Sequence, residues 1–214
     1  MLISTIGMAS FRTSSDKLTF ISENMYFVVP GNSKQIFVSM VGGGGRGGIG
    51  SIQDGLFIAG GGGGAGGACS RIPFYNEGYV SFDCRVGKGG NEEYPNGNDT
   101  EVDIYIDDVF NTTFSVKGGK SAEGKLGGLG GKGYYTFNGL DGSEGTVSLS
   151  SHLPVAGAGG SSIHYNGGVG MTYDMLDNSQ TNGNWGSGGG GGLPGADSLL
   201  IGNGGDGFIV IEYI

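Results

Sequence analysis

The chain has 214 residues, of which 51 are glycine, and its net charge is −9. This acidic balance argues against nucleic acid and anionic membrane surfaces as partners. With 36% hydrophobic and only 14% charged residues, the composition is not that of a disordered chain. No apolar run approaches 18 residues and the N-terminus lacks a basic region, so we expect neither membrane insertion nor a signal peptide.

The first 41 residues predict an arm followed by a β-hairpin. Residues 1–17 end in a polar cluster and form either an arm or a short strand. Residues 18–21 and 25–29 are rich in β-branched and aromatic side chains, as strands are. A turn at 30–33 then leads into a return strand at 34–41. We therefore treat residues 1–41 as one unit.

Glycine dominates the stretch that follows, from Val41 to Gly67. Ordering a glycine costs roughly 0.5–1 kcal/mol relative to alanine, so a folded glycine run needs a packing that only glycine allows. A polyproline-II-type helix, with three residues per turn and no internal hydrogen bonds, offers one. Such polyglycine-II helices would exchange backbone hydrogen bonds side by side. The alternative is a flexible linker, for which glycine-rich segments are also typical.

The rest of the chain alternates between strands and further glycine segments. Alternating apolar residues predict a strand at 79–86, and a hairpin at 100–116 with its turn at Asp107 and Asp108. Residues 208–214 predict a closing strand, and no window predicts an amphipathic helix. The glycine segments between these strands lie at 87–90, 124–133, 157–160, 167–170 and 188–192.

The predicted fold class is therefore all-β with little or no α-helix. β-Hairpins and a C-terminal strand would flank a bundle of packed polyglycine-II helices. Residues 42–214 would form this glycine-rich domain, continuous with the hairpin of residues 1–41.

The order of these pieces resembles a known family. The carrying residues are Val29-Pro30-Gly31, then 38–45, 60–67, 86–90 and the closing 204–213. From residue 18 onward the chain is similar to the glycine-rich domain of phage tail-fibre adhesins and giant-virus virion proteins. The resemblance implies a sandwich of polyglycine-II helices, with receptor recognition in the loops at one end of the adhesins. The chain departs from the family pattern in its long polar loops at 91–100 and 171–186 and in its N-terminal hairpin within residues 1–41, a candidate attachment module. These departures leave adhesin and minor capsid protein both open.

No motif predicts catalysis, a metal or a cofactor. Gly119-Lys120-Ser121 resembles the end of a phosphate-binding loop, but the first glycine of that motif would fall on Phe114. Neither a nucleophile elbow nor a Ser-His-Asp order is present. Cys69 and Cys84 are expected to be reduced, partly buried thiols. A set of acidic residues fits exposed turns and strand faces better than a divalent-cation site: Glu92, Glu93, Asp99, Asp103, Asp107 and Asp108.

Aromatic residues in polar loops are the candidate binding residues, because such rings supply rigid contact area with a polar edge. The alternative is that these rings cap the ends of the glycine bundle. The residues are Tyr94, Tyr134, Tyr135, Tyr165, Tyr173 and Trp185.

We predict from these features a non-enzymatic virion structural protein, either a minor capsid or a fibre component. Its partners would be other virion proteins. The alternative is a distal adhesin that recognises a host-surface glycan or protein through the aromatic loops.

Overall fold

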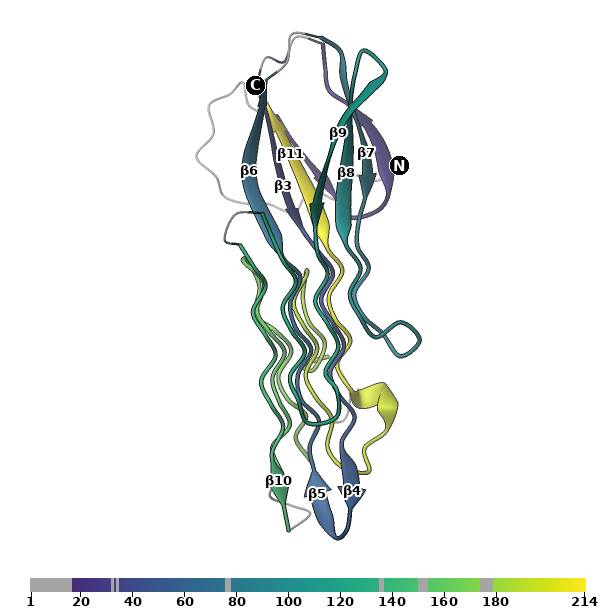
Figure 1. The fold of residues 1–214 in the computed structure, drawn as a ribbon, viewed down its shortest axis with the longest axis vertical. Coiled ribbons are helices and arrows are strands. Elements are labelled where there is room, and N and C mark those ends of the chain that lie inside the picture. The colour runs from purple at the N-terminus through teal and green to yellow at the C-terminus, as the bar shows by residue number, and fades with distance from the viewer. Residues whose placement is uncertain are drawn as a thin grey trace.

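The computed structural model describes residues 17–31, 33, 35–75, 78–134, 137–149, 154–173 and 179–214. The molecule is elongated, with a strand-rich end, a long bundle of glycine segments and a distal end that carries a small sheet (Figure 1). The predicted all-β class is confirmed: the described residues contain eleven strands and one short 3₁₀ helix, η1 (Ser198–Leu200). No described helix has the length and apolar character needed to cross a membrane.

Three antiparallel sheets contain all the strands. The first sheet has the order β1 (Lys17–Ile21), β11 (Phe208–Tyr213), β3 (Gln35–Val41) and β6 (Ala68–Tyr75). The second has the order β2 (Met25–Val28), β7 (Val80–Arg85), β8 (Thr100–Ile106) and β9 (Val109–Val116). The distal sheet has the order β10 (Val147–Ser148), β5 (Leu56–Ile58) and β4 (Ser51–Gln53).

The predicted N-terminal hairpin is wrong. β2 pairs with β7 in the second sheet, whereas β3 lies between β11 and β6 in the first. Between β2 and β3 the chain thus passes from one sheet to the other instead of folding back on itself. Met25 and Phe27 on β2 and Val38 on β3 contact the same core from opposite sides. This shared burial, which no local turn signal encodes, decides the pairing.

The second predicted hairpin and the closing strand are confirmed. β8 pairs with β9, and Asp107 and Asp108 occupy the turn with φ of 51° and 62°. Two successive positive φ values define the type I′ turn, which matches the twist of paired strands. The closing strand β11 lies inside the first sheet, paired with β1 and β3.

The core of the strand-rich end lies between the first and second sheets. Val38, Phe82, Ile104 and Ile211 are fully buried members of one apolar cluster. Cys69 and Cys84 belong to the same cluster as free, buried thiols. Burial raises the pKa of Cys69 to about 11 and that of Cys84 to about 12.

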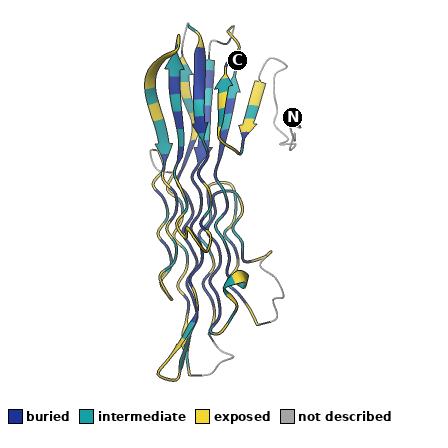
Figure 2. Ribbon diagram, turned by 90° about the vertical axis from the view of Figure 1, so that its right-hand side faces the viewer, coloured by how far each residue is buried: buried dark blue, intermediate teal, exposed yellow. Residues whose placement is uncertain are grey.

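Three buried glycine segments form the centre of the bundle: 42–48, 59–68 and 186–192. We call them the central segments, and they run along the long axis of the bundle (Figure 2). Every residue in them is buried, although almost none has a side chain larger than a methyl group. The interior of the bundle is therefore backbone packed on backbone.

Hydrogen bonds from the central segments follow a period of three residues. In 42–48, the first, fourth and seventh N–H groups donate to carbonyls in 61–67. The second and fifth donate to 95–98, and the third and sixth to 202–205. Successive N–H groups thus point in three directions, unlike the two directions of a β-strand. Three residues per turn is the period that the polyglycine-II prediction requires.

The three central segments also bond to one another in a closed triangle. Gly45 donates to the carbonyl of Gly64 at 2.8 Å, Gly63 to Gly189 at 2.8 Å, and Gly189 back to Gly45 at 2.9 Å. In segment 59–68, every third N–H group donates to a carbonyl in residues 137–146. A second set of N–H groups, also three residues apart, donates to carbonyls in residues 117–124. Each central segment is therefore surrounded by bonded neighbours.

The surrounding outer segments repeat the same period in their sequence. In 126–133, two glycines separate each outward side chain from the next, at Leu126, Leu129 and Lys132. In 137–146, Gly139, Gly142 and Gly145 turn toward segment 59–68, because a Cβ on each would meet a carbonyl of that segment. About one residue in three is glycine in 137–146, and about two in three are glycine in 126–133. The share of glycine in an outer segment thus follows the number of segments that pack against it.

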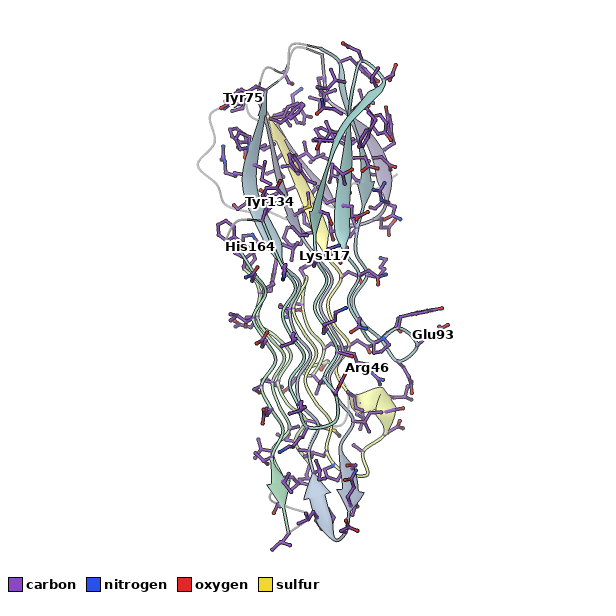
Figure 3. All side chains as sticks on the ribbon, viewed as in Figure 1. Arg46, Tyr75, Glu93, Lys117, Tyr134 and His164 are labelled. Atoms are coloured by element: carbon purple, nitrogen blue, oxygen red, sulfur yellow. The ribbon has the colours of Figure 1, made fainter. Side chains whose placement is uncertain are left out.

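Arg46 is the single large side chain of segment 42–48. It is 6% exposed, and its Nη2 donates to the carbonyl of Ser198 at 2.6 Å. Figure 3 shows the side chain lying beside η1. Arg46 therefore ties the η1 segment to the bundle.

We predict that adding one methyl group inside the bundle prevents folding. A Cβ on Gly62 would overlap the carbonyl oxygen of Ala158, and one on Gly190 that of Val169. Both obstacles are backbone atoms that no rotamer change removes. Gly62→Ala and Gly190→Ala should lack the cooperative thermal transition of the wild type, measured by far-UV circular dichroism.

Gly31→Ala is the matched control, because a Cβ there meets nothing within 4 Å. Its free energy of unfolding should differ from wild type by less than about 0.5 kcal/mol. Wild-type melting of both interior variants would contradict the packing described above.

Candidate functional site

The predicted aromatic residues are spread over the molecule. Tyr94 is 66% exposed in the loop at 91–95, which projects from the flank of the bundle. Tyr134 lies at the junction of the sheets and the bundle, with its ring 5.8 Å from that of Phe114. In Figure 3, Tyr134 and Glu93, the neighbour of Tyr94, lie at different heights. Tyr173 is exposed, and Tyr135 lies outside the described residues.

Trp185 and Tyr165 instead pack at the junction between the first sheet and the bundle. Both lie against a buried cluster that includes Phe208. The Trp185 ring meets Phe208 at 6.1 Å and Phe20 at 5.5 Å, edge to face in both pairs. This placement matches the capping alternative for these two rings, and a binding role for the aromatic set stays a prediction.

An open hollow lies on the flank, where the 91–99 loop and an outer glycine segment meet the second sheet. Its volume is about 510 Å³, and we call it the flank pocket. Four segments that are distant in sequence build it: the chain before β2, the end of β7, the 95–101 region and the outer segment at 117–122. The polar side chains that line it include Asn24, Arg85, Asn96, Asn98, Glu101 and Lys120.

A network of ion pairs fixes the upper wall of the flank pocket. Arg85 Nη1 lies 2.8 Å from Asp103 Oδ2 and 3.2 Å from Asp83 Oδ2, and Nη2 lies 3.2 Å from Glu101 Oε2. The hydrogen bond to Asp103 is the main cause of a raised pKa of Arg85. The same bond holds the pKa of Asp103 below its usual value. The guanidinium is thus held by three carboxylates from two adjacent strands.

Two of the three asparagines at the pocket are oriented by the backbone. Asn24 Oδ1 accepts the N–H of Val86 at 2.8 Å, and Asn96 Oδ1 accepts the N–H of Ser121 at 3.0 Å. Their oxygens are therefore occupied, while neither NH₂ group has a hydrogen-bond partner among the described residues. Among the residues that the structure describes, the side chains of Asn98 and Lys120 also have no hydrogen-bond partner. The NH₂ groups of Asn24 and Asn96 are thus hydrogen-bond donors whose positions are already set.

Four of the six acidic residues weighed as a cation site have other roles in the structure. Asp99 Oδ2 lies 2.6 Å from Lys117 Nζ, and this hydrogen bond raises the pKa of Lys117. Asp103 pairs with Arg85, and Asp107 and Asp108 form the β8–β9 turn. Among the described residues, no group of three His, Cys, Asp or Glu side chains is arranged to hold a metal ion.

The distal end carries exposed apolar side chains. The β4–β5 hairpin turns at Asp54 and Gly55, with φ of 50° and 77°. Beside it, β10 pairs with β5 and leads to Leu149, which is 83% exposed. We call Ile52, Val147 and Leu149 together the distal tip.

Sequence reasoning did not find the flank pocket. The 91–100 loop stood out as long and polar, and Lys120 stood out only as part of a failed phosphate-loop match. No local pattern in the sequence links Asn24 to Lys120. The pairing of β2 with β7 places Asn24 beside Val86, and the outer segment at 117–122 brings Lys120 to the same hollow. The available signal was the asparagine content of the loop, at Asn96 and Asn98.

Two antiparallel sheets that continue into hydrogen-bonded glycine segments define an all-β, glycine-rich protein. A family model described as a glycine-rich domain matches residues 19–214, and the chain belongs to that family. The predicted family resemblance is thereby confirmed for the domain, while its phage and giant-virus context stays a prediction. No curated protein matches the chain.

We predict that Asp103→Asn lowers the stability of the second sheet in a pH-dependent way. The pKa of Asp103 lies below 3.8 in the folded protein, chiefly through Arg85. The folded state therefore binds its proton less readily than the unfolded state, and the stabilisation is fully present above pH 3.8 and lost below it. At pH 7 the variant should lose about 1–2 kcal/mol in urea unfolding, and the loss should shrink as the pH falls below about 4.

Asp54→Asn serves as the control for removing one carboxylate. Asp54 has no ion-pair partner in the part of the chain that the structure describes. An equal loss in both variants, or a loss for Asp103→Asn that persists at pH 2–3, would contradict the role assigned to the Arg85 pair.

Proposed function

We propose that this protein is a non-enzymatic structural component of a virion, in a minor capsid or fibre position. The glycine bundle serves as a rigid shaft that separates the strand-rich end from the distal tip. The observation that carries this proposal is the closed triangle of hydrogen bonds among the three central segments. Bending such a shaft would break backbone hydrogen bonds in three directions, whereas a sheet resists bending in one plane only.

The outer surface of the shaft carries exposed apolar side chains, which support the proposal that the shaft contacts other virion proteins. Four exposed apolar side chains stand on consecutive outer segments: Leu129, Leu140, Val155 and Val169. These segments are hydrogen-bonded neighbours, through Gly142 to Gly128, Ser143 to Ala158 and Gly159 to Gly168. The four residues, which we call the apolar flank, thus belong to one side of the shaft. Exposed apolar patches on soluble proteins commonly mark interaction surfaces.

The state of the two thiols supports a non-enzymatic role. A cysteine acts as a nucleophile in its thiolate form, at an accessible and electropositive position. Cys69 and Cys84 lie inside the sandwich core, and burial keeps them protonated at neutral pH. They therefore act as core side chains.

A second candidate function is that of a distal receptor-binding adhesin. The observation that favours it is the distal tip, where Ile52 and Leu149 are 57% and 83% exposed on different segments. A rigid shaft that ends in exposed apolar side chains suits a protein that presents its tip to another surface.

Particles of the virus that encodes the chain provide the test. We expect the chain to band with the particles in a density gradient at a fixed ratio to the capsid protein, and to resist a high-salt wash. Recovery of the chain only in the soluble fraction would overturn the virion proposal.

Two matched sets of variants then separate the two functions. Leu129→Asp and Leu140→Asp alter the apolar flank, and Ile52→Asp and Leu149→Asp alter the distal tip. For a structural component, the flank variants should lower incorporation into particles several-fold while the tip variants incorporate normally. For an adhesin, the tip variants should incorporate normally and lose attachment to host cells.

A further inference from the structure

We propose that the flank pocket binds a neutral oligosaccharide. This site is separate from the apolar flank and the distal tip. None of the described aromatic residues predicted from the sequence lines it, although Tyr94 lies in the adjoining loop. The proposal goes beyond the structural role and does not depend on it, because the side chains that line the pocket carry it whether or not the chain belongs to a virion. It rests on three features of the pocket: its charge balance, its oriented donors and its open shape.

The charges of the side chains that line the pocket cancel. Arg85 and Lys120 contribute two positive charges, and Asp99 and Glu101 contribute two negative ones. Arg85, Asp99 and Glu101 are already paired, either with one another or with Lys117. A phosphate or sulfate group would meet carboxylates, and a divalent cation would meet the guanidinium. The balance therefore favours an uncharged ligand.

The donor groups suit hydroxyl ligands. The Asn24 and Asn96 amides are fixed by the N–H groups of Val86 and Ser121, so their NH₂ groups need no further ordering when a ligand binds. Asn98 adds a second kind of contact, because an amide both donates and accepts. Lys120 supplies donors from the opposite segment. A sugar hydroxyl also donates and accepts, and neighbouring hydroxyls match such an array.

The shape of the pocket favours a chain over a small enclosed molecule. Its volume of about 510 Å³ lies within the usual range of ligand sites. The hollow is open to solvent, and Val86 is its single large apolar lining residue, so an apolar ligand would gain little there. An oligosaccharide can lie in this hollow and continue out of it at either end.

The test uses an array of neutral hexose and N-acetylhexosamine oligosaccharides, with sialylated and sulfated counterparts, probed with the full chain. We expect binding to neutral members, weaker binding to charged ones, and confirmation by titration of the best neutral oligosaccharide. Asn96→Asp keeps the oxygen that accepts from Ser121 but removes the NH₂ donor, and Asn24→Asp does the same at Val86. Each variant should bind roughly three- to tenfold more weakly, and Lys120→Ala should weaken binding to a similar degree.

Asn91→Asp is the matched control. Asn91 lies in the same loop, and its Oδ1 accepts from the N–H groups of Glu93 and Tyr94, but it does not line the pocket. It should bind like wild type, and thermal melting of every variant confirms the fold. Absence of any neutral oligosaccharide binding by the wild type would overturn the proposal. Equal affinity of Asn91→Asp, Asn24→Asp and Asn96→Asp, or loss of binding in the tip variant Leu149→Asp, would also overturn it.

Discussion

The fold depends on a backbone contact that only glycine permits. At the centre of the bundle, the carbonyl oxygen of one segment occupies the position that a Cβ of the next segment would need. The carbonyl oxygen of Gly63, for example, lies where a Cβ on Gly188 would be. Ordering each glycine costs roughly 0.5–1 kcal/mol relative to alanine. One net backbone hydrogen bond contributes a similar amount, about 0.5–1.5 kcal/mol. The bundle is therefore stable only when almost all of its N–H groups find acceptors, which makes its assembly cooperative.

This constraint extends into the strand-rich end, because sheets and bundle share their chain segments without linkers. β3 runs directly from Val41 into Gly42, and β11 begins at Phe208 directly after Gly207. Val41 and Ala68 are paired in the first sheet, and the adjoining Gly42 donates to Gly67 in the bundle. The register of the strands thus sets the register of the glycine segments. The flank pocket lies where the second sheet meets the bundle, so both parts position its walls.

Features of the fold that follow from local patterns were predictable from the sequence. The strand at 100–106, its Asp107-Asp108 turn and the closing strand depend on alternation and turn chemistry. The pairing of β2 with β7 was not predictable, because the core shared with Val38 is non-local. The three-residue spacing at Leu126, Leu129 and Lys132 was present in the sequence and marks an outer segment. The pocket was not predictable, because Asn24 and Lys120 meet only after the sheets have formed.

The spacing of the outer segments has a consequence for how this protein can evolve. Each outward side chain, such as Leu129, is adjacent in the sequence to glycines that make the interior contacts, such as Gly128. A codon change at the outward position alters the surface, and one at its neighbour alters the interior. Surface and interior are therefore encoded by separate positions within each triplet of residues. The shaft can acquire new contact surfaces by successive single substitutions while its interior stays the same.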